Sequence, residues 1–189
     1  VTAKVAVGLT LDEIMLANTP ASFEPTLDYV VTKVARFPFD KFSDASNKLG
    51  TQMKATGEVM SIGRTMEESL LKAMRSLETG VCHIYHKKFD DWTNDRLLEY
   101  IAEPTDDRLY AIAQLIRGGV DLVLIYNRTK IDMFFLEKFK NIVEFERVVE
   151  AAPMDIEVLR EAKRMGFSDK FIGQLWGCLL YTSDAADEA

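Results

Sequence analysis

The sequence has few cysteines and no long apolar run. Only Cys82 and Cys178 occur, far apart in 189 residues, which is too few for the disulfide framework of a small secreted domain. No apolar stretch approaches the roughly 20 residues that a membrane helix needs. Residues 1–6 also lack the charged and apolar regions of a signal peptide. We therefore expect a reducing compartment, the cytoplasm, and no membrane partner.

An excess of basic residues is also missing. The net charge is -7, and Asp184, Asp187 and Glu188 near the end add to it without a Lys or Arg nearby. A nucleic-acid surface needs a stripe of Lys and Arg, so we expect no nucleic-acid partner. Apolar residues make up 48% of the chain, which is enough for a sizeable core.

The motifs of a self-sufficient enzyme are absent. No glycine-rich phosphate loop occurs, and Gly118-Gly119 lies between two predicted helices, which is typical of a tight turn. Cys82, His83 and His86 lie within five residues, but a closed zinc site usually needs four ligands. We interpret this segment as a loop with partly exposed imidazoles. We expect no catalytic, cofactor-binding or metal-binding residue in this chain.

Two runs of β-forming residues lie in the first third of the chain. Residues 23–34 place Leu27, Tyr29 and Val31 on one face at period two. Residues 58–62 form a shorter apolar run between Gly57 and Gly63. We expect two strands that can pair with each other.

Helix signals surround these strands. Residues 2–7 resemble the end of a helix that Gly8 caps. Thr10 with Glu13, and Thr65 with Glu68, have the spacing of a capping box, which predicts a short helix before Pro20 and a longer one ending near Gly80.

Beyond Gly80 the pattern is helical throughout. Breaks at Pro104, Gly118-Gly119, Pro153 and Gly166 separate six predicted helices, over residues 95–101, 108–117, 122–126, 131–150, 156–165 and 169–176. The longest has an apolar stripe that includes Phe135, Phe139, Ile142 and Val143, and the acidic Glu146 falls in the same stripe. We predict an α/β part over residues 1–78 and an all-helical part over residues 79–177, so that the fold is mainly α overall.

Two features keep alternatives open. Residues 155–176 have the outline of a DNA-binding helix-turn-helix, but in the second helix only Gln174 suits base readout. Glu58 begins an apolar strand, where a carboxylate is costly to bury unless something pairs with it or uses it. A solvated strand end explains Glu58 equally well.

Several strings resemble large subunits of carbamoyl-phosphate synthetase. The most specific are FEPTLDYVVTK at residues 23–33 and QMKATGEVMSIGRT at residues 52–65. The likeness continues in DRLYAI at 107–112, KIDMFFL at 130–136 and KRMGFSD at 163–169. It covers nearly all of residues 1–177.

The resemblance implies an internal piece of that subunit. Residues 1–78 would be an α+β remnant, the end of the first ATP-grasp domain, and residues 79–177 would be an all-α oligomerisation domain. The parent enzyme makes carbamoyl phosphate from bicarbonate, glutamine-derived ammonia and two ATP, with Mg²⁺ or Mn²⁺ and K⁺. Its nucleotide and metal residues would lie upstream of Val1, so this piece would bind no cofactor and be inactive alone.

The resemblance also implies site residues and partners. Leu27, Met53 and Glu58 match residues that line the family's internal carbamate tunnel. Partners would be the remainder of the large subunit, the glutamine amidotransferase small subunit and further copies in a homo-oligomer. Residues 178–189 match no family continuation, and we expect disorder over 182–189. The rival hypothesis is a standalone helical protein-protein interaction module.

Overall fold

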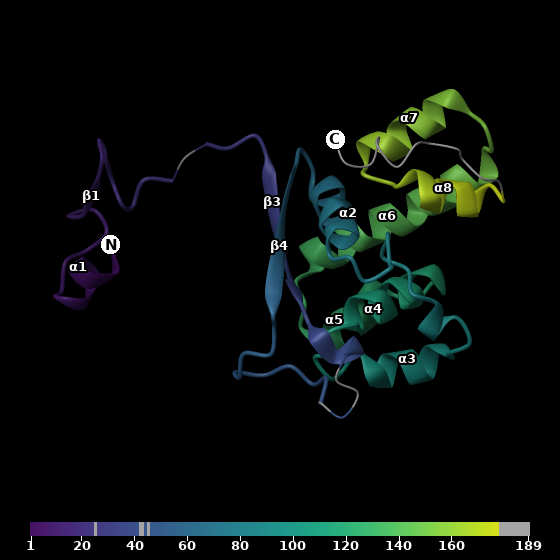
Figure 1. Ribbon diagram of the computed structural model, residues 1–189, viewed down its shortest axis with the longest axis horizontal. Coiled ribbons are helices and arrows are strands. Elements are labelled where there is room, and N and C mark those ends of the chain that lie inside the picture. The colour runs from purple at the N-terminus through teal and green to yellow at the C-terminus, as the bar shows by residue number, and fades with distance from the viewer. Residues whose placement is uncertain (25, 42–43, 45, 178–189) are drawn as a thin grey trace.

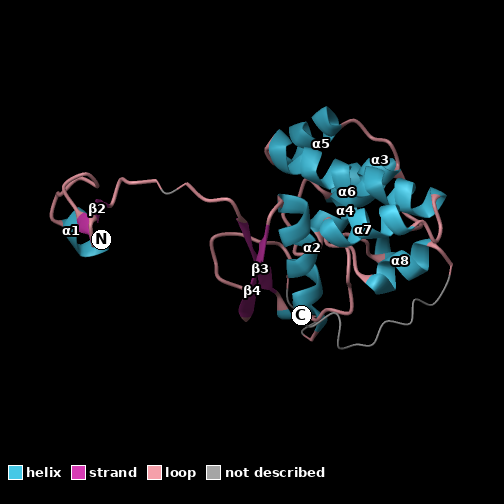
Figure 2. Ribbon diagram, turned by 90° about the horizontal axis from the view of Figure 1, so that it is seen from above, coloured by secondary structure: helices cyan, strands magenta, loops and turns pink. Residues whose placement is uncertain are grey.

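The computed structural model describes residues 1–24, 26–41, 44 and 46–177. The predicted tail, residues 178–189, lies outside them. Figure 1 shows a small N-terminal unit, an extended connection, a two-stranded sheet and a body of helices. The N-terminal unit holds α1 (Thr2–Ala6) and a hairpin of β1 (Met15–Leu16) and β2 (Thr19–Pro20), and lies apart from the body in both views (Figure 2).

The predicted short helix after Thr10 is wrong, because a turn and the β1–β2 hairpin take its place. Half of the expected cap forms: the Glu13 carboxylate accepts bonds from the Thr10 backbone N–H and hydroxyl, at 2.9 and 3.0 Å. Nearly all side chains here are exposed, apart from Ile14 at 1%. A helix of two turns with no face to bury does not offset the cost of its first turn. Gly8 does adopt a left-handed conformation, at φ 95°.

The second sheet confirms the predicted strand pair. β3 (Val30–Arg36) and β4 (Gly57–Gly63) are antiparallel, with Val31 opposite Ile62 and Ala35 opposite Glu58. One face packs on α2 (Met66–Ser76), where the Thr32 and Ser69 hydroxyls lie 2.6 Å apart. The strand begins later than predicted, so Leu27 and Tyr29 precede it.

The predicted helices beyond Gly80 are confirmed, with ends shifted by three residues or fewer. Their bounds are α3 (Asn94–Tyr100), α4 (Arg108–Arg117), α5 (Leu122–Thr129), α6 (Met133–Ala151), α7 (Ile156–Arg164) and α8 (Asp169–Leu175). Side chains cap the first turn of all of these except α4, and Thr65 caps α2 with its hydroxyl 3.2 Å from the Glu68 N–H. The fold of the described residues is thus mainly helical, with two small antiparallel sheets.

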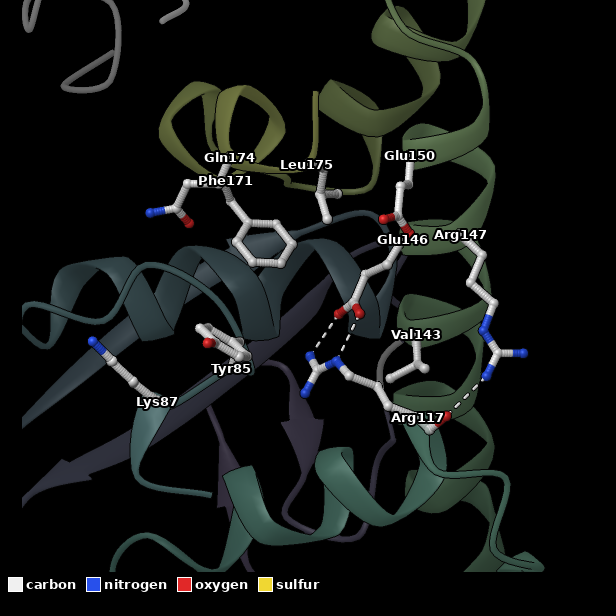
Figure 3. Close-up of a pocket in the computed structure, with 10 residues that line it drawn as sticks. All are labelled: Tyr85, Lys87, Arg117, Val143, Glu146, Arg147, Glu150, Phe171, Gln174 and Leu175. Atoms are coloured by element: carbon white, nitrogen blue, oxygen red, sulfur yellow. Dashed lines mark hydrogen bonds and ion pairs between the residues drawn. The ribbon is translucent and has the colours of Figure 1, made fainter. Parts of the chain in front are cut away.

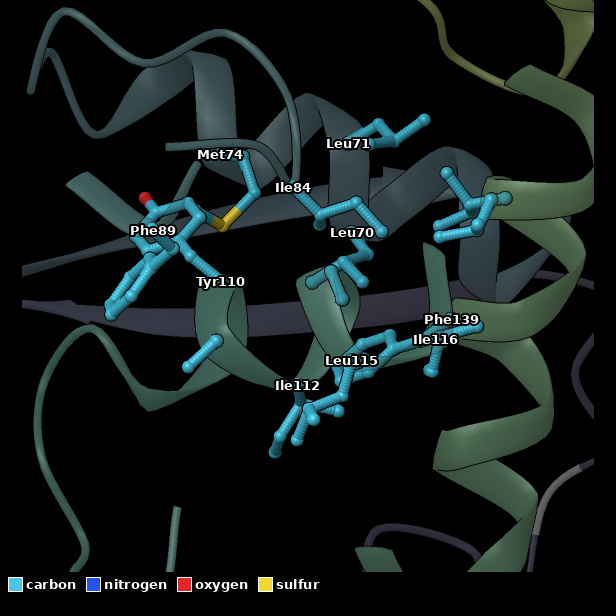
Figure 4. Close-up of a cluster of buried hydrophobic side chains, with 14 of the residues drawn as sticks. Leu70, Leu71, Met74, Ile84, Phe89, Tyr110, Ile112, Leu115, Ile116 and Phe139 are labelled. Carbon is cyan, nitrogen blue, oxygen red and sulfur yellow. The ribbon is translucent and has the colours of Figure 1, made fainter. Parts of the chain in front are cut away.

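A single apolar cluster joins α2 to the helices that follow it (Figure 4). Leu71, Leu115, Leu136 and Ile142 are wholly buried in it. The long helix α6 contacts α2, α4, α5, α7 and α8, so it organises the helical part. Phe135 is an exception to the predicted stripe, because it lies at the start of α6 and stays 43% exposed. None of the described helices combines the length and the apolar character needed to cross a bilayer.

Candidate functional site

The three predicted tunnel residues are on the surface, and Leu27 and Glu58 are not brought together. Leu27 is 55% and Met53 90% exposed, and Glu58 forms an exposed ion pair with Lys33, at 2.7 Å. Glu58 lies opposite Ala35 near one end of the sheet, while Leu27 precedes Val30 at the other end. Five residues of strand alone separate these ends by roughly 16 Å. Glu58 therefore lies at a solvent-exposed end of the strand, as one of the two alternatives had it.

The sheet face turned away from α2 is an exposed apolar surface. We call it the outer sheet face, made of Val31, Lys33, Met60 and Ile62. Its apolar members are 45%, 66% and 53% exposed for Val31, Met60 and Ile62. Strand alternation puts them on one side, opposite the buried Thr32 and Ser61.

A buried ionic cluster joins three segments of the helical part. Arg117 at the end of α4 donates to both oxygens of Glu146 on α6, with Nε and Nη2 each at 2.7 Å. His83 in the loop after Gly80 places Nε2 2.9 Å from Glu146 Oε1. Arg117 Nη2 also donates to the Ile84 carbonyl at 3.0 Å. We call His83, Arg117 and Glu146 the Glu146 cluster.

In this cluster Glu146 is stabilised as a carboxylate and His83 as a neutral imidazole. Burial acts to raise the pKa of Glu146, but the hydrogen bonds and charge of Arg117, with the His83 bond, outweigh it and bring the pKa below 4.5. Burial lowers the pKa of His83 below 6.5, against the opposing pull of Glu146. Because an ionised carboxylate only accepts, a neutral His83 donates from Nε2 to Glu146.

His83 is not the partly exposed imidazole that the sequence suggested, because it is 1% exposed. Its ring stacks on Phe171 of α8, with centroids 3.7 Å apart and planes 14° apart. Nδ1 is buried without a hydrogen-bond partner among the described residues. The His83 ring therefore packs α8 against the loop, while its Nε2 bonds to Glu146.

A pocket beside this cluster lies between α6 and α8, with a volume of about 770 Å³ (Figure 3). Val143, Phe171 and Leu175 give it apolar walls, and Arg117 and Glu146 face it as a bonded pair. Both Glu146 oxygens are engaged, so this carboxylate is poorly placed to act as a general base.

Metal-ligating side chains do not gather in groups of three within the described residues. No group of three or more His, Cys, Asp or Glu side chains within them could hold one ion. His83 is committed to Glu146, and His86 Nδ1 accepts the Lys88 backbone N–H at 3.1 Å. Arg117 and Glu146 were not predicted as a site. The only signal was an acidic residue within an apolar helix stripe.

The family model described as "Carbamoyl-phosphate synthetase large chain, oligomerisation domain" matches residues 58–187. The chain belongs to this family. The match covers more than half of the chain and includes β4 from its second residue and every helix from α2 to α8. The resemblance to carbamoyl-phosphate synthetase is thereby confirmed, and the domain is part of a ligase. The boundary proposed between residues 78 and 79 stays a prediction.

Proposed function

We propose that this chain is the oligomerisation part of a carbamoyl-phosphate synthetase large chain, preceded by the end of its first ATP-grasp domain. Its role is to shape the subunit and join it to others. The chemistry, which makes carbamoyl phosphate from bicarbonate, ammonia and ATP, takes place on parts of the enzyme outside this chain. The observation that carries this proposal is the outer sheet face.

The two-stranded sheet leaves one face without a cover. Isolated pairs of strands are marginally stable, and packing against a helix is one way to stabilise them. Here α2 covers one face, while Val31, Met60 and Ile62 remain exposed on the other. Contiguous exposed apolar surface typically marks an interface. The remainder of the large chain is the partner that we propose for it.

The tunnel role of Leu27, Met53 and Glu58 rests on the same proposal. Their exposure suits residues whose opposite wall is contributed by another part of the enzyme. The dry path that protects carbamate from water would then form only in the assembled subunit. We further propose a homo-oligomer, a glutamine amidotransferase partner and a cytoplasmic location, with ATP, Mg²⁺ or Mn²⁺ and K⁺ bound by the parent enzyme.

Calorimetric titration of the purified chain with Mg-ATP tests the assignment of chemistry to other parts. We expect no binding heat above background, because the described residues present no cluster for the cation. Micromolar binding, or nucleotide turnover by the chain alone, would contradict the proposal.

Co-purification tests the docking surface. The chain is co-expressed with a large-chain segment that carries the first ATP-binding half, and the two are expected to purify together. Met60→Lys should abolish the association, since it replaces an apolar member of the outer sheet face with a second cation directly opposite Lys33. Met154→Lys is the matched control, because Met154 is 72% exposed on the helical part. Equal loss of co-purification in both variants would show that the outer sheet face is not the docking surface.

A further inference from the structure

The outward side of α5 carries apolar residues that the rest of the described chain leaves exposed. Ile125 is wholly buried and holds the helix against the core, whereas Val123 and Leu124 are each 52% exposed. Tyr126 is 38% exposed on the same helix. At 3.6 residues per turn, Val123 and Asn127 lie about 160° around the helix from Ile125, and Leu124 and Tyr126 lie about 100° from it on the two flanks. We call these four residues the α5 outer face.

The charges at the two ends of α5 have opposite signs. Asp121 caps the first turn, with Oδ1 2.8 Å from the Val123 N–H. Arg128 lies in the last turn and Lys130 caps it, with Lys130 Nζ 5.4 Å from the Tyr126 ring centroid. Arg128 forms no ion pair with any described residue. The helix therefore presents the carboxylate of Asp121 at one end, the guanidinium of Arg128 at the other, and apolar side chains between them.

We propose that two copies of this chain meet through the α5 outer face, with the two α5 helices antiparallel about a two-fold axis near Leu124 and Ile125. This inference rests on the proposed function, since it names the surface of self-association. A two-fold contact must be self-complementary. An antiparallel pair meets this condition here, because each Asp121 then lies beside Arg128 of the partner subunit. The opposed helix dipoles favour the same arrangement.

The size of the patch sets the expected strength. A helix of eight residues is about 12 Å long, and such a pair buries less than the roughly 800 Å² per partner of a standard interface. The contact should therefore be weak, with dimers that form as the concentration rises. Salt should weaken it further, because the end-to-end ion pairs lie at the solvent-exposed rim.

Sedimentation velocity of the full chain over a wide concentration range tests the proposal. The wild type should shift from monomer to dimer, and Val123→Asp should keep it monomeric by burying a charge in the contact. Val148→Asp is the matched control, since Val148 is a 46% exposed valine on α6. Circular dichroism and thermal melting establish that both variants are folded.

Charge changes test the antiparallel arrangement. Arg128→Glu should lower the dimer association constant about tenfold or more, because it places like charges together at both ends. Asp121→Asn, which keeps a capping side chain, should weaken the dimer and reduce its salt dependence. A monomeric wild type at all concentrations, or dimers that survive Val123→Asp, would overturn the inference. Neither result bears on Mg-ATP binding or on co-purification, so failure of the proposed function is detected separately.

Discussion

His83 and Glu146 form a buried hydrogen bond of 2.9 Å although 63 residues separate them in the sequence. Each contacts a further element, since His83 stacks on Phe171 of α8 and Glu146 holds Arg117 of α4. One carboxylate therefore secures four segments of the helical part.

Glu146→Gln is expected to destabilise the chain by about 3 kcal/mol, because it leaves the Arg117 cation partly buried without its counter-ion. The free energy of unfolding is measured by urea titration with tryptophan fluorescence. Glu144→Gln is the control: its side chain is 56% exposed beside Lys140, and the expected change is within about 0.5 kcal/mol. Equal effects would show that the Glu146 cluster does not stabilise the fold.

The stability should fall as the pH drops below about 6.5. His83 has its pKa lowered by burial in the folded chain, so below its ordinary pKa of 6.5 the unfolded chain binds a proton that the folded chain does not. The free energy of unfolding therefore decreases as the pH falls, by up to about 1.4 kcal/mol per pH unit. The lowered pKa of Glu146 has the same sign, but its effect begins only near pH 4.5.

Urea midpoints at pH 7.5 and 5.5 measure this effect. His83→Gln should narrow the difference between the urea midpoints at the two pH values. Parallel pH profiles for the wild type and this variant would show that His83 is not the titrating group.

Gly166→Ala should be more damaging than Gly80→Ala. Both glycines have positive φ, 90° and 80°, where an L-residue costs about 1–2 kcal/mol. A Cβ on Gly80 meets nothing within 4 Å, but on Gly166 it would lie 3.0 Å from the Glu68 carbonyl oxygen and 3.1 Å from its Cα. The difference between the two unfolding free energies measures the close approach of α2 to the turn before α8. Equal losses of stability in the two variants would mean that the backbone near residue 166 moves away from the new Cβ without a cost in stability.

Glu58→Gln in an intact large chain tests the tunnel proposal. The Lys33–Glu58 pair is 59% exposed on both sides, so stability should change by less than about 1 kcal/mol. We expect bicarbonate-dependent ATP hydrolysis to continue while carbamoyl phosphate formation slows. Lys33→Gln, which breaks the same ion pair, is the control. Equal loss of both activities with Glu58→Gln would assign Glu58 a local structural role.

Local patterns were sufficient for the regular elements and failed where long-range contacts decide. The bounds of α4 agree with those predicted, because the apolar spacing and Gly118-Gly119 fix both ends. The β3–β4 pairing followed from two β-rich runs. The helix expected at Thr10 did not form, because a capping pattern cannot indicate whether the helix has a surface to pack on.

The Glu146 cluster could not be predicted because its members come from three segments. His83 looked like a loop residue beside Cys82, and no local pattern links it to α6. Glu146 was visible as an acid in an apolar stripe, which indicates a partner but not which one. Phe135 shows the opposite failure: its spacing predicts burial, but its position at the first turn of α6 leaves it partly exposed.

The position of α2 has a consequence for how the chain can be divided. Leu70, Leu71 and Met74 fill the helical core, while Ser69 on the same helix bonds to Thr32 of β3. Removing the first 78 residues would strip the remaining helices of one wall and leave a hole lined by apolar side chains. Any shortened version meant for crystallisation or display should therefore begin ahead of β3, so that both strands travel with the helix that they cover.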